Sequence, residues 1–248
     1  MEEKLALRLF GHPELRCGDT PIAIGRRHVL ALLAILAETA RPLPRGRVAG
    51  MLWPETDEAT VRARLRRLMH RLSAAVGRDA IVTAGETIGL DPDIAVDSRD
   101  FLALAEAGLR MRDAGTLHRA AELHGAPFLD GFELPHAQGF SDWVLARRAE
   151  LERLQARVLR ALAEVDAQAG DCDAAIAAAS RLLALDPFRE QSHRLLMRLH
   201  AQAGHADRLE AAFRHCVQVL SDELGVAPSP ETRSEYARLR GAPVPKIE

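Results

Sequence analysis

Residues 53–72, WPETDEATVRARLRRLMHRL, combine regularly spaced aliphatic residues with five arginines and one histidine. An α-helix turns by about 100° per residue. On a helix over residues 59–76, the aliphatic side chains that fall within about 80° of one another are Val61, Leu65, Leu68, Leu72 and Val76. This spacing predicts a helix that buries one narrow stripe and directs its arginines elsewhere.

The segments on either side make this helix the third of three. Residues 5–11 (LALRLFG), 14–17 (ELRC) and 20–25 (TPIAIG) read as short strands between turn residues. Residues 26–40 change to a helical period, and residues 45–53 predict a second helix that Pro54 stops. Two β-type runs in residues 79–92 flank Ala84–Gly85–Glu86, which predicts a hairpin. The predicted order is strands, three helices and a hairpin.

After residue 97 the pattern predicts helices only, including a long helix from about Ser141 to Ala169 and a last one over residues 233–240. An offset of 34 residues superposes similar residues in two segments: Gly170 on Gly204, Ala178 on Ala212, and Leu182 on Cys216. That period is the length of a tetratricopeptide (TPR) unit, a helical hairpin that buries its face by stacking on its neighbours. The spacing from Gly115 to Ala120 matches that from Gly170 to Ala175, which suggests an earlier, degenerate unit.

We therefore expect a mainly α protein with two domains. Residues 1–97 would form an α+β domain, residues 98–240 an all-α domain of TPR-like helical repeats, and residues 241–248 a flexible tail.

Composition excludes several classes of protein. The formal net charge is −2, no apolar run is long enough for a membrane span, and residues 1–10 (MEEKLALRLF) lack the basic and apolar regions expected of a signal peptide. Three scattered cysteines fit reduced thiols in a cytoplasmic protein. Neither of the two lysines lies in a phosphate-binding loop, no nucleophile motif occurs, and the ten histidines show no metal-ligand spacing. We expect no enzyme activity, no cofactor and no metal.

The arginines of residues 53–72 leave two interpretations open. They could form a solvated face, because arginine is a good helix former. Alternatively they bind a polyanion, since residues 60–78 hold six arginines and no acid that would neutralise them. Residues 1–97 hold 14 Lys and Arg against 13 Asp and Glu, a net charge of +1, so binding would depend on this one patch.

Several strings resemble a known family over nearly the whole chain. The order of strands, three helices and hairpin is similar to the winged helix-turn-helix of the OmpR/PhoB type, and LRLFG, the segment from LALLAILAETARPLP to RLRRLMHRL, and LDPDIAVD match one branch of it. FLDGFELPHAQGFSDW, DPFRE, RLLMRLHAQAG and ELGVAPSPET resemble the bacterial transcriptional activator domain (BTAD). Together they resemble the SARP/AfsR group of transcriptional regulators.

The resemblance implies a sequence-specific, double-stranded-DNA-binding regulator, an activator that acts as a dimer or oligomer on promoter repeats and contacts RNA polymerase. The third helix would enter the major groove. Candidates for base edges are Thr60, Ala63, Arg64 and Arg67. Candidates for phosphates are Arg45, Arg47, Arg62, Arg66, His70 and Arg71. Glu55, Asp57 and Glu58 would face polymerase, although helix capping is an equally good interpretation of these acids.

The chain departs from the family at the tip of the hairpin wing. Residues 84–87 carry one acid and no arginine, so the third helix would bear more of the specificity. A rival hypothesis is a TPR-like scaffold that binds a protein partner on its helical surface, with a winged domain that docks protein instead of DNA.

Overall fold

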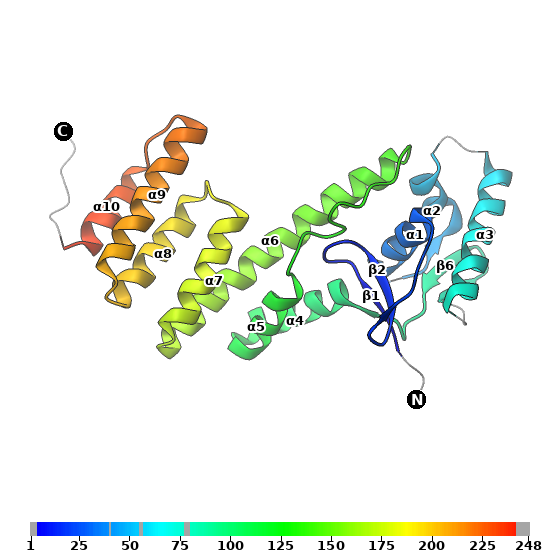
Figure 1. The fold of residues 1–248 in the computed structure, drawn as a ribbon, viewed down its shortest axis with the longest axis horizontal. Coiled ribbons are helices and arrows are strands. Elements are labelled where there is room, and N and C mark those ends of the chain that lie inside the picture. The colour runs from blue at the N-terminus through cyan, green and yellow to red at the C-terminus, as the bar shows by residue number, and fades with distance from the viewer. Residues whose placement is uncertain (1–3, 40, 55–56, 77–79, 242–248) are drawn as a thin grey trace. The chain divides into compact units, whose positions relative to one another are not determined.

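The computed structural model describes residues 4–39, 41–54, 57–76 and 80–241. The chain forms two compact units, one of Met1–Glu106 with Arg119–Arg153 and one of Ala107–His118 with Leu154–Glu248. Figure 1 shows strands only in the first unit, while the second is built from helices. The prediction of a mainly α chain with an N-terminal α+β part is confirmed.

A four-stranded sheet opens the first unit. It contains β1 (Leu5–Arg8), β2 (Glu14–Cys17), β3 (Thr20–Pro21) and β7 (Ala95–Val96), in the order β3-β2-β1-β7. Alternate residues of β1 are buried, because successive side chains of a strand point to opposite faces. The third strand is shorter than the sequence predicts, and β7, which pairs in parallel with β1, was not predicted at all.

Three helices follow, as predicted: α1 (Arg27–Ala37), α2 (Arg45–Leu52) and α3 (Glu58–Val76). Every residue of α1 from Val29 to Ala37 is buried, so α1 is the central helix of this part. Pro44 precedes α2, and α2 ends one residue before Trp53. On α3 the expected stripe is buried at Val61, Leu65, Leu68 and Leu72, whereas Val76 at the end is half-exposed.

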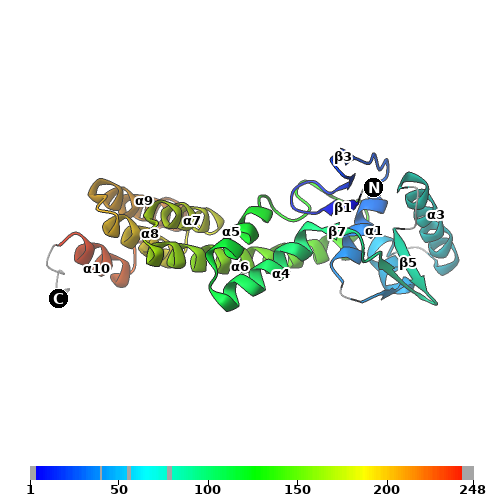
Figure 2. The same cartoon turned by 90° about the horizontal axis from the view of Figure 1, so that it is seen from below.

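The predicted hairpin, which we call the wing, consists of β5 (Ile81–Ala84) and β6 (Thr87–Leu90). Strand β4 (Leu43–Pro44) pairs with β6 and completes a small sheet in the order β4-β6-β5. Gly85 makes the turn with φ of 57°, a conformation that costs glycine little because it has no Cβ. Figure 2 shows the wing beside α3.

The first unit continues past the domain boundary that the sequence predicts at residue 97. The Asp97 carboxylate accepts hydrogen bonds from the backbone N–H groups of Leu9, at 2.8 Å, and Phe10, at 3.1 Å. The buried carboxylate of Glu38, the residue directly after α1, pairs with Arg147 and accepts a hydrogen bond from the Ser98 hydroxyl. These contacts join residues on both sides of position 97, and that boundary stays a prediction.

The remaining helices are α4 (Asp97–Met111), α5 (Ala114–Leu123), α6 (Gln138–Ala169), α7 (Cys172–Leu185), α8 (Glu190–Gln202), α9 (Ala206–Leu224) and α10 (Pro230–Leu239). The 34-residue period corresponds to equivalent turns. Gly170 and Gly204 have φ of 86° and 73°, and the N–H of the residue after each donates to a carbonyl five residues earlier. Ala178 and Ala212 are buried at equivalent places, as are Leu182 and Cys216.

The alignment of Gly115 with Gly170 is wrong. Gly115 lies inside α5, and the turn before α5 is made by Arg112, which has φ of 50°. Asp113 there accepts from the Thr116 N–H at 2.7 Å, as Asp171 does from Ala174 at 3.0 Å. The capping aspartates, and not the glycines, are the equivalent residues.

Candidate nucleic-acid interface

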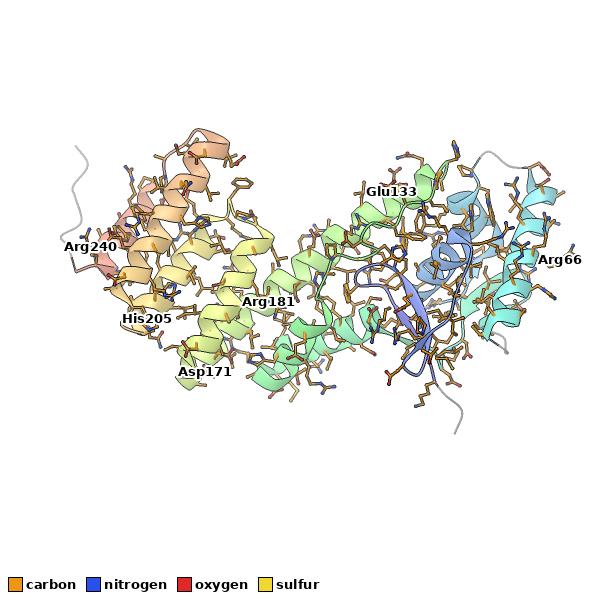
Figure 3. All side chains as sticks on the ribbon, viewed as in Figure 1. Arg66, Glu133, Asp171, Arg181, His205 and Arg240 are labelled. Carbon is orange, nitrogen blue, oxygen red and sulfur yellow. The ribbon has the colours of Figure 1, made fainter. Side chains whose placement is uncertain are left out.

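Helix α3 carries its cationic side chains away from its buried stripe. Arg62, Arg66, Arg67, His70 and Arg71 are exposed. Thr60, Ala63 and Arg64 are half-exposed. In Figure 3, Arg66 lies on the side of α3 that faces away from α1 and α2. The core packing of α3 therefore leaves its arginines at the surface.

The N-terminus of α3 is capped by Asp57. Its carboxylate accepts a hydrogen bond from the Thr60 N–H at 3.0 Å, and the bonds from Thr60 hold the pKa of Asp57 below its ordinary value. This is the capping role that the sequence left open, since a side-chain oxygen here satisfies an N–H of the first turn. Glu55 lies outside the described residues, and of Glu58 only the backbone is described, as the first residue of α3.

A groove of about 840 Å³ lies between α2, α3 and the wing, and we call it the wing groove. It brings together several predicted residues: Arg45, Arg62, Ala63 and Arg66. Thr83 and Glu86 contribute the wall on the wing. The Nε of Arg45 is buried and has no hydrogen-bond partner among the described residues, which leaves a donor to be satisfied by a ligand or water.

A second groove of about 750 Å³ lies on the opposite flank of α3, and we call it the α1 groove. Arg64, Arg67 and Arg71 line it, so the structure separates these three from the arginines of the wing groove. The Nε of Arg67 donates to the Ala63 carbonyl at 3.2 Å. Arg47 and His70, both exposed, line neither groove.

Sequence reasoning missed the other walls of the α1 groove. Arg26 and His28 come from the start of α1, Trp53 follows α2, and Pro135 and His136 come from the loop before α6. His28 stacks on Trp53 with ring centroids 5.3 Å apart and planes inclined by 10°. Burial, followed by the charges of Arg64 and Arg26, lowers the pKa of His28. The three consecutive cationic residues 26–28 could have indicated that the start of α1 contributes to a binding surface. No pattern in the sequence around His136 indicates that it lies in the same groove.

Other kinds of site find little support. Within the residues that the structure describes, no group of three or more His, Cys, Asp or Glu could hold a metal ion. No described helix is long and apolar enough to cross a membrane. His193 and His200 are packed in the core of the second unit.

Comparison with known proteins links both parts of the chain to regulators. Residues 96–240 match the family model of the bacterial transcriptional activator domain. The chain is 28% identical to the regulatory protein AfsR of Streptomyces coelicolor over 90% of its own length and 23% of that of AfsR. It is 26% identical to the transcriptional regulatory protein EmbR of Mycobacterium tuberculosis, over 96% of this chain and 64% of EmbR. With the regulatory protein DnrI of Streptomyces peucetius the identity is 28%, over 90% of this chain and 87% of DnrI.

A solved structure of Mycobacterium tuberculosis EmbR, in complex with a low-affinity phosphopeptide, has the same fold. It superposes with a TM-score of 0.71 at 24% identity over 98% of this chain and 67% of the EmbR chain. The chain thus spans less than a quarter of AfsR and less than two thirds of the EmbR sequence. The chain belongs to the family of bacterial transcriptional regulators that carry the bacterial transcriptional activator domain, the SARP/AfsR type.

Proposed function

We propose that the chain is a sequence-specific DNA-binding transcriptional regulator whose helix α3 reads the major groove. One observation carries the proposal: α3 buries its aliphatic stripe and carries five arginines outside that stripe, in a segment, residues 60–76, that contains no acidic residue. Such a helix fits the major groove, where arginine pairs with guanine through two hydrogen bonds and other arginines hold phosphates.

We propose two roles for the candidate residues of α2 and α3. Thr60, Ala63, Arg64 and Arg67 lie toward the N-terminal half of the helix and are proposed to reach base edges. For the phosphates we propose Arg45, Arg47, Arg62, Arg66, His70 and Arg71. Thr60 is already held in place by the Asp57 cap, which fixes the start of the helix for reading.

The proposed regulator acts as an activator, on repeated sites and in more than one copy. Near-neutral charge over residues 1–97 limits the affinity of one copy, and two copies on adjacent repeats would raise the effective concentration of each. The segment before α3, with Asp57 exposed, is our proposed contact with RNA polymerase.

Selection from random duplexes tests this function directly. The purified chain of residues 1–248 should enrich a defined, repeated sequence, and fluorescence anisotropy should then give at least about 100-fold tighter binding to that sequence than to a scrambled one. Arg67→Ala should remove most of this difference, while Arg8→Ala, an exposed arginine on β1, should not. Failure to enrich any sequence at low salt would refute the proposal.

A second candidate function rests on exposed apolar side chains in the second unit. Leu185 and Phe188, on either side of Asp186, are 41% and 43% exposed, and Val217 and Leu224 of α9 are 37% and 52% exposed. Apolar surface of this kind often marks a protein-binding site. If the chain is a scaffold, Phe188→Ser should abolish partner binding and the arginines of α3 should be dispensable.

A further inference from the structure

The α1 groove gathers cationic side chains from three separate parts of the chain. Arg26 and His28 belong to the start of α1, the three arginines 64, 67 and 71 to α3, and His136 to the loop between α5 and α6. Among the described residues that line the groove none is acidic. A groove of this composition suits an anion, because its cationic side chains together attract negative charge.

The three arginines of α3 form a row along the groove. Their spacing of three and then four residues places them on one face of the helix, and seven residues of helix span about 10 Å. The row therefore follows an extended anion better than a single small one. Arg64 and Arg67 are also proposed base contacts, so the groove borders the surface that would face DNA.

The opposite flank of α3, where the proposed phosphate contacts Arg45, Arg62 and Arg66 lie, gains no cation from the wing. The wing carries no arginine or lysine between residues 81 and 90, and Glu86 at its tip lines the wing groove. A carboxylate there repels phosphates. The balance of charge between the two flanks thus favours the α1 groove.

The α5–α6 loop is held firmly against this groove. Phe132, Leu134 and Ala137 are buried, and the Nη1 of Arg27 donates to the Glu133 carbonyl at 3.4 Å. Figure 3 labels Glu133 on this loop. His136 has φ of 59°, a left-handed conformation that is uncommon for a residue with a side chain and that clusters at binding sites. The anchored loop directs an exposed imidazole into the groove.

We infer that the α1 groove seats one strand of the DNA backbone, and that the α5–α6 loop, which lies outside the winged part, contributes to DNA binding through His136. The inference rests on the proposed DNA binding by α3. Arg26 and Arg71 contact phosphates from the two walls of the groove, and the ring N–H of His136 donates to a phosphate oxygen. The loop compensates for the wing that lacks cations.

Two variants of the full chain test this inference. Arg26→Gln removes one charge from the wall on α1. His136→Gly removes the imidazole and keeps the left-handed backbone, which glycine tolerates. Neither side chain is buried, so the fold should persist, and circular dichroism checks it. Arg8→Ala is the matched control, because Arg8 is exposed but lies outside the groove.

The readout is the affinity for duplex DNA as a function of salt. Loss of one phosphate contact should weaken binding to cognate and scrambled duplexes by a similar factor, about fivefold to twentyfold, without changing their ratio. For Arg26→Gln the slope of log K against log salt should fall by about 1, while His136→Gly should lose affinity and Arg8→Ala should match the wild type.

Each other outcome overturns the inference in a distinguishable way. If the wild type binds no duplex, the proposed function fails as well. If Arg64→Ala weakens binding but Arg26→Gln and His136→Gly do not, only the inference fails. If calorimetry finds that inorganic phosphate binds the groove saturably and Arg26→Gln removes that binding with no effect on duplex affinity, the groove is a small-anion site instead.

Discussion

Replacing Leu65 with alanine would separate the folding role of α3 from its proposed binding role. Leu65 is 3% exposed in the buried stripe of α3, and the change removes three carbon atoms from the core. At about 0.8 kcal/mol per buried methylene the loss of transfer free energy is about 2.4 kcal/mol. The cavity left behind adds to this. Leu65 also lines the wing groove, which gives the site room to relax, so we expect a total loss near 3 kcal/mol.

Arg67→Ala is the matched comparison on the same helix. Its side chain is exposed, and its Nε donates a hydrogen bond to the carbonyl of Ala63 one turn earlier. We expect a change in stability below about 0.5 kcal/mol, as for most surface substitutions.

Calorimetry and DNA binding measured on the two variants give opposite patterns. Leu65→Ala should lower Tm by about 6–12 °C and bind duplex DNA normally at temperatures where it is folded. Arg67→Ala should keep its Tm and lose affinity. The reasoning is refuted if both variants lose stability equally, or if Leu65→Ala leaves Tm unchanged, because then the stripe is not the packed face of α3.

Three further predictions concern other parts of the fold. Arg147→Met leaves the buried Glu38 carboxylate without its cation, and denaturant titration should show a loss of about 3–5 kcal/mol, partly restored by adding Glu38→Gln. Gly204→Ala forces a side chain into φ of 73° and should cost roughly 1 kcal/mol by the same assay, whereas Gly46→Ala, inside α2, should not destabilise. Burial lowers the pKa of His193 and His200 below the ordinary 6.5, so the unfolded state binds more protons than the folded state. The stability contributed by these neutral histidines should therefore be complete above pH 6.5 and fall as the pH drops below it. Melting curves measured from about pH 8 to about pH 5 would check this.

The sequence predicts the elements whose signals are local. The stripe of α3 follows from helical periodicity, and the wing follows from the turn residues around Gly85 between two β-type runs. The equivalence of Gly170 and Gly204 follows from a repeat that places two glycines in the same turn. In each case the residues that decide one helix, hairpin or turn lie close together in the sequence.

The features that the sequence does not predict depend on contacts between distant segments. Strand β7 has two residues, and it exists because they pair with β1 almost ninety positions earlier. Helix α10 begins at Pro230, earlier than the periodicity suggests, and its cap Ser229 is held by the distant Glu190 carboxylate, which accepts hydrogen bonds from the Ser229 N–H and hydroxyl. The α1 groove brings together residues 26 and 136, so only the folded chain shows that its cations share one surface.

The central claim is that the arginines of α3 bind DNA, and the salt dependence of duplex binding by the Arg64→Ala/Arg67→Ala double variant tests it most directly. The account predicts that the wild type binds a selected duplex with a steep slope of log K against log salt, and that the double variant loses about 2 from this slope and at least 100-fold in affinity at unchanged Tm. Equal affinity and equal slope for the two proteins would contradict the account.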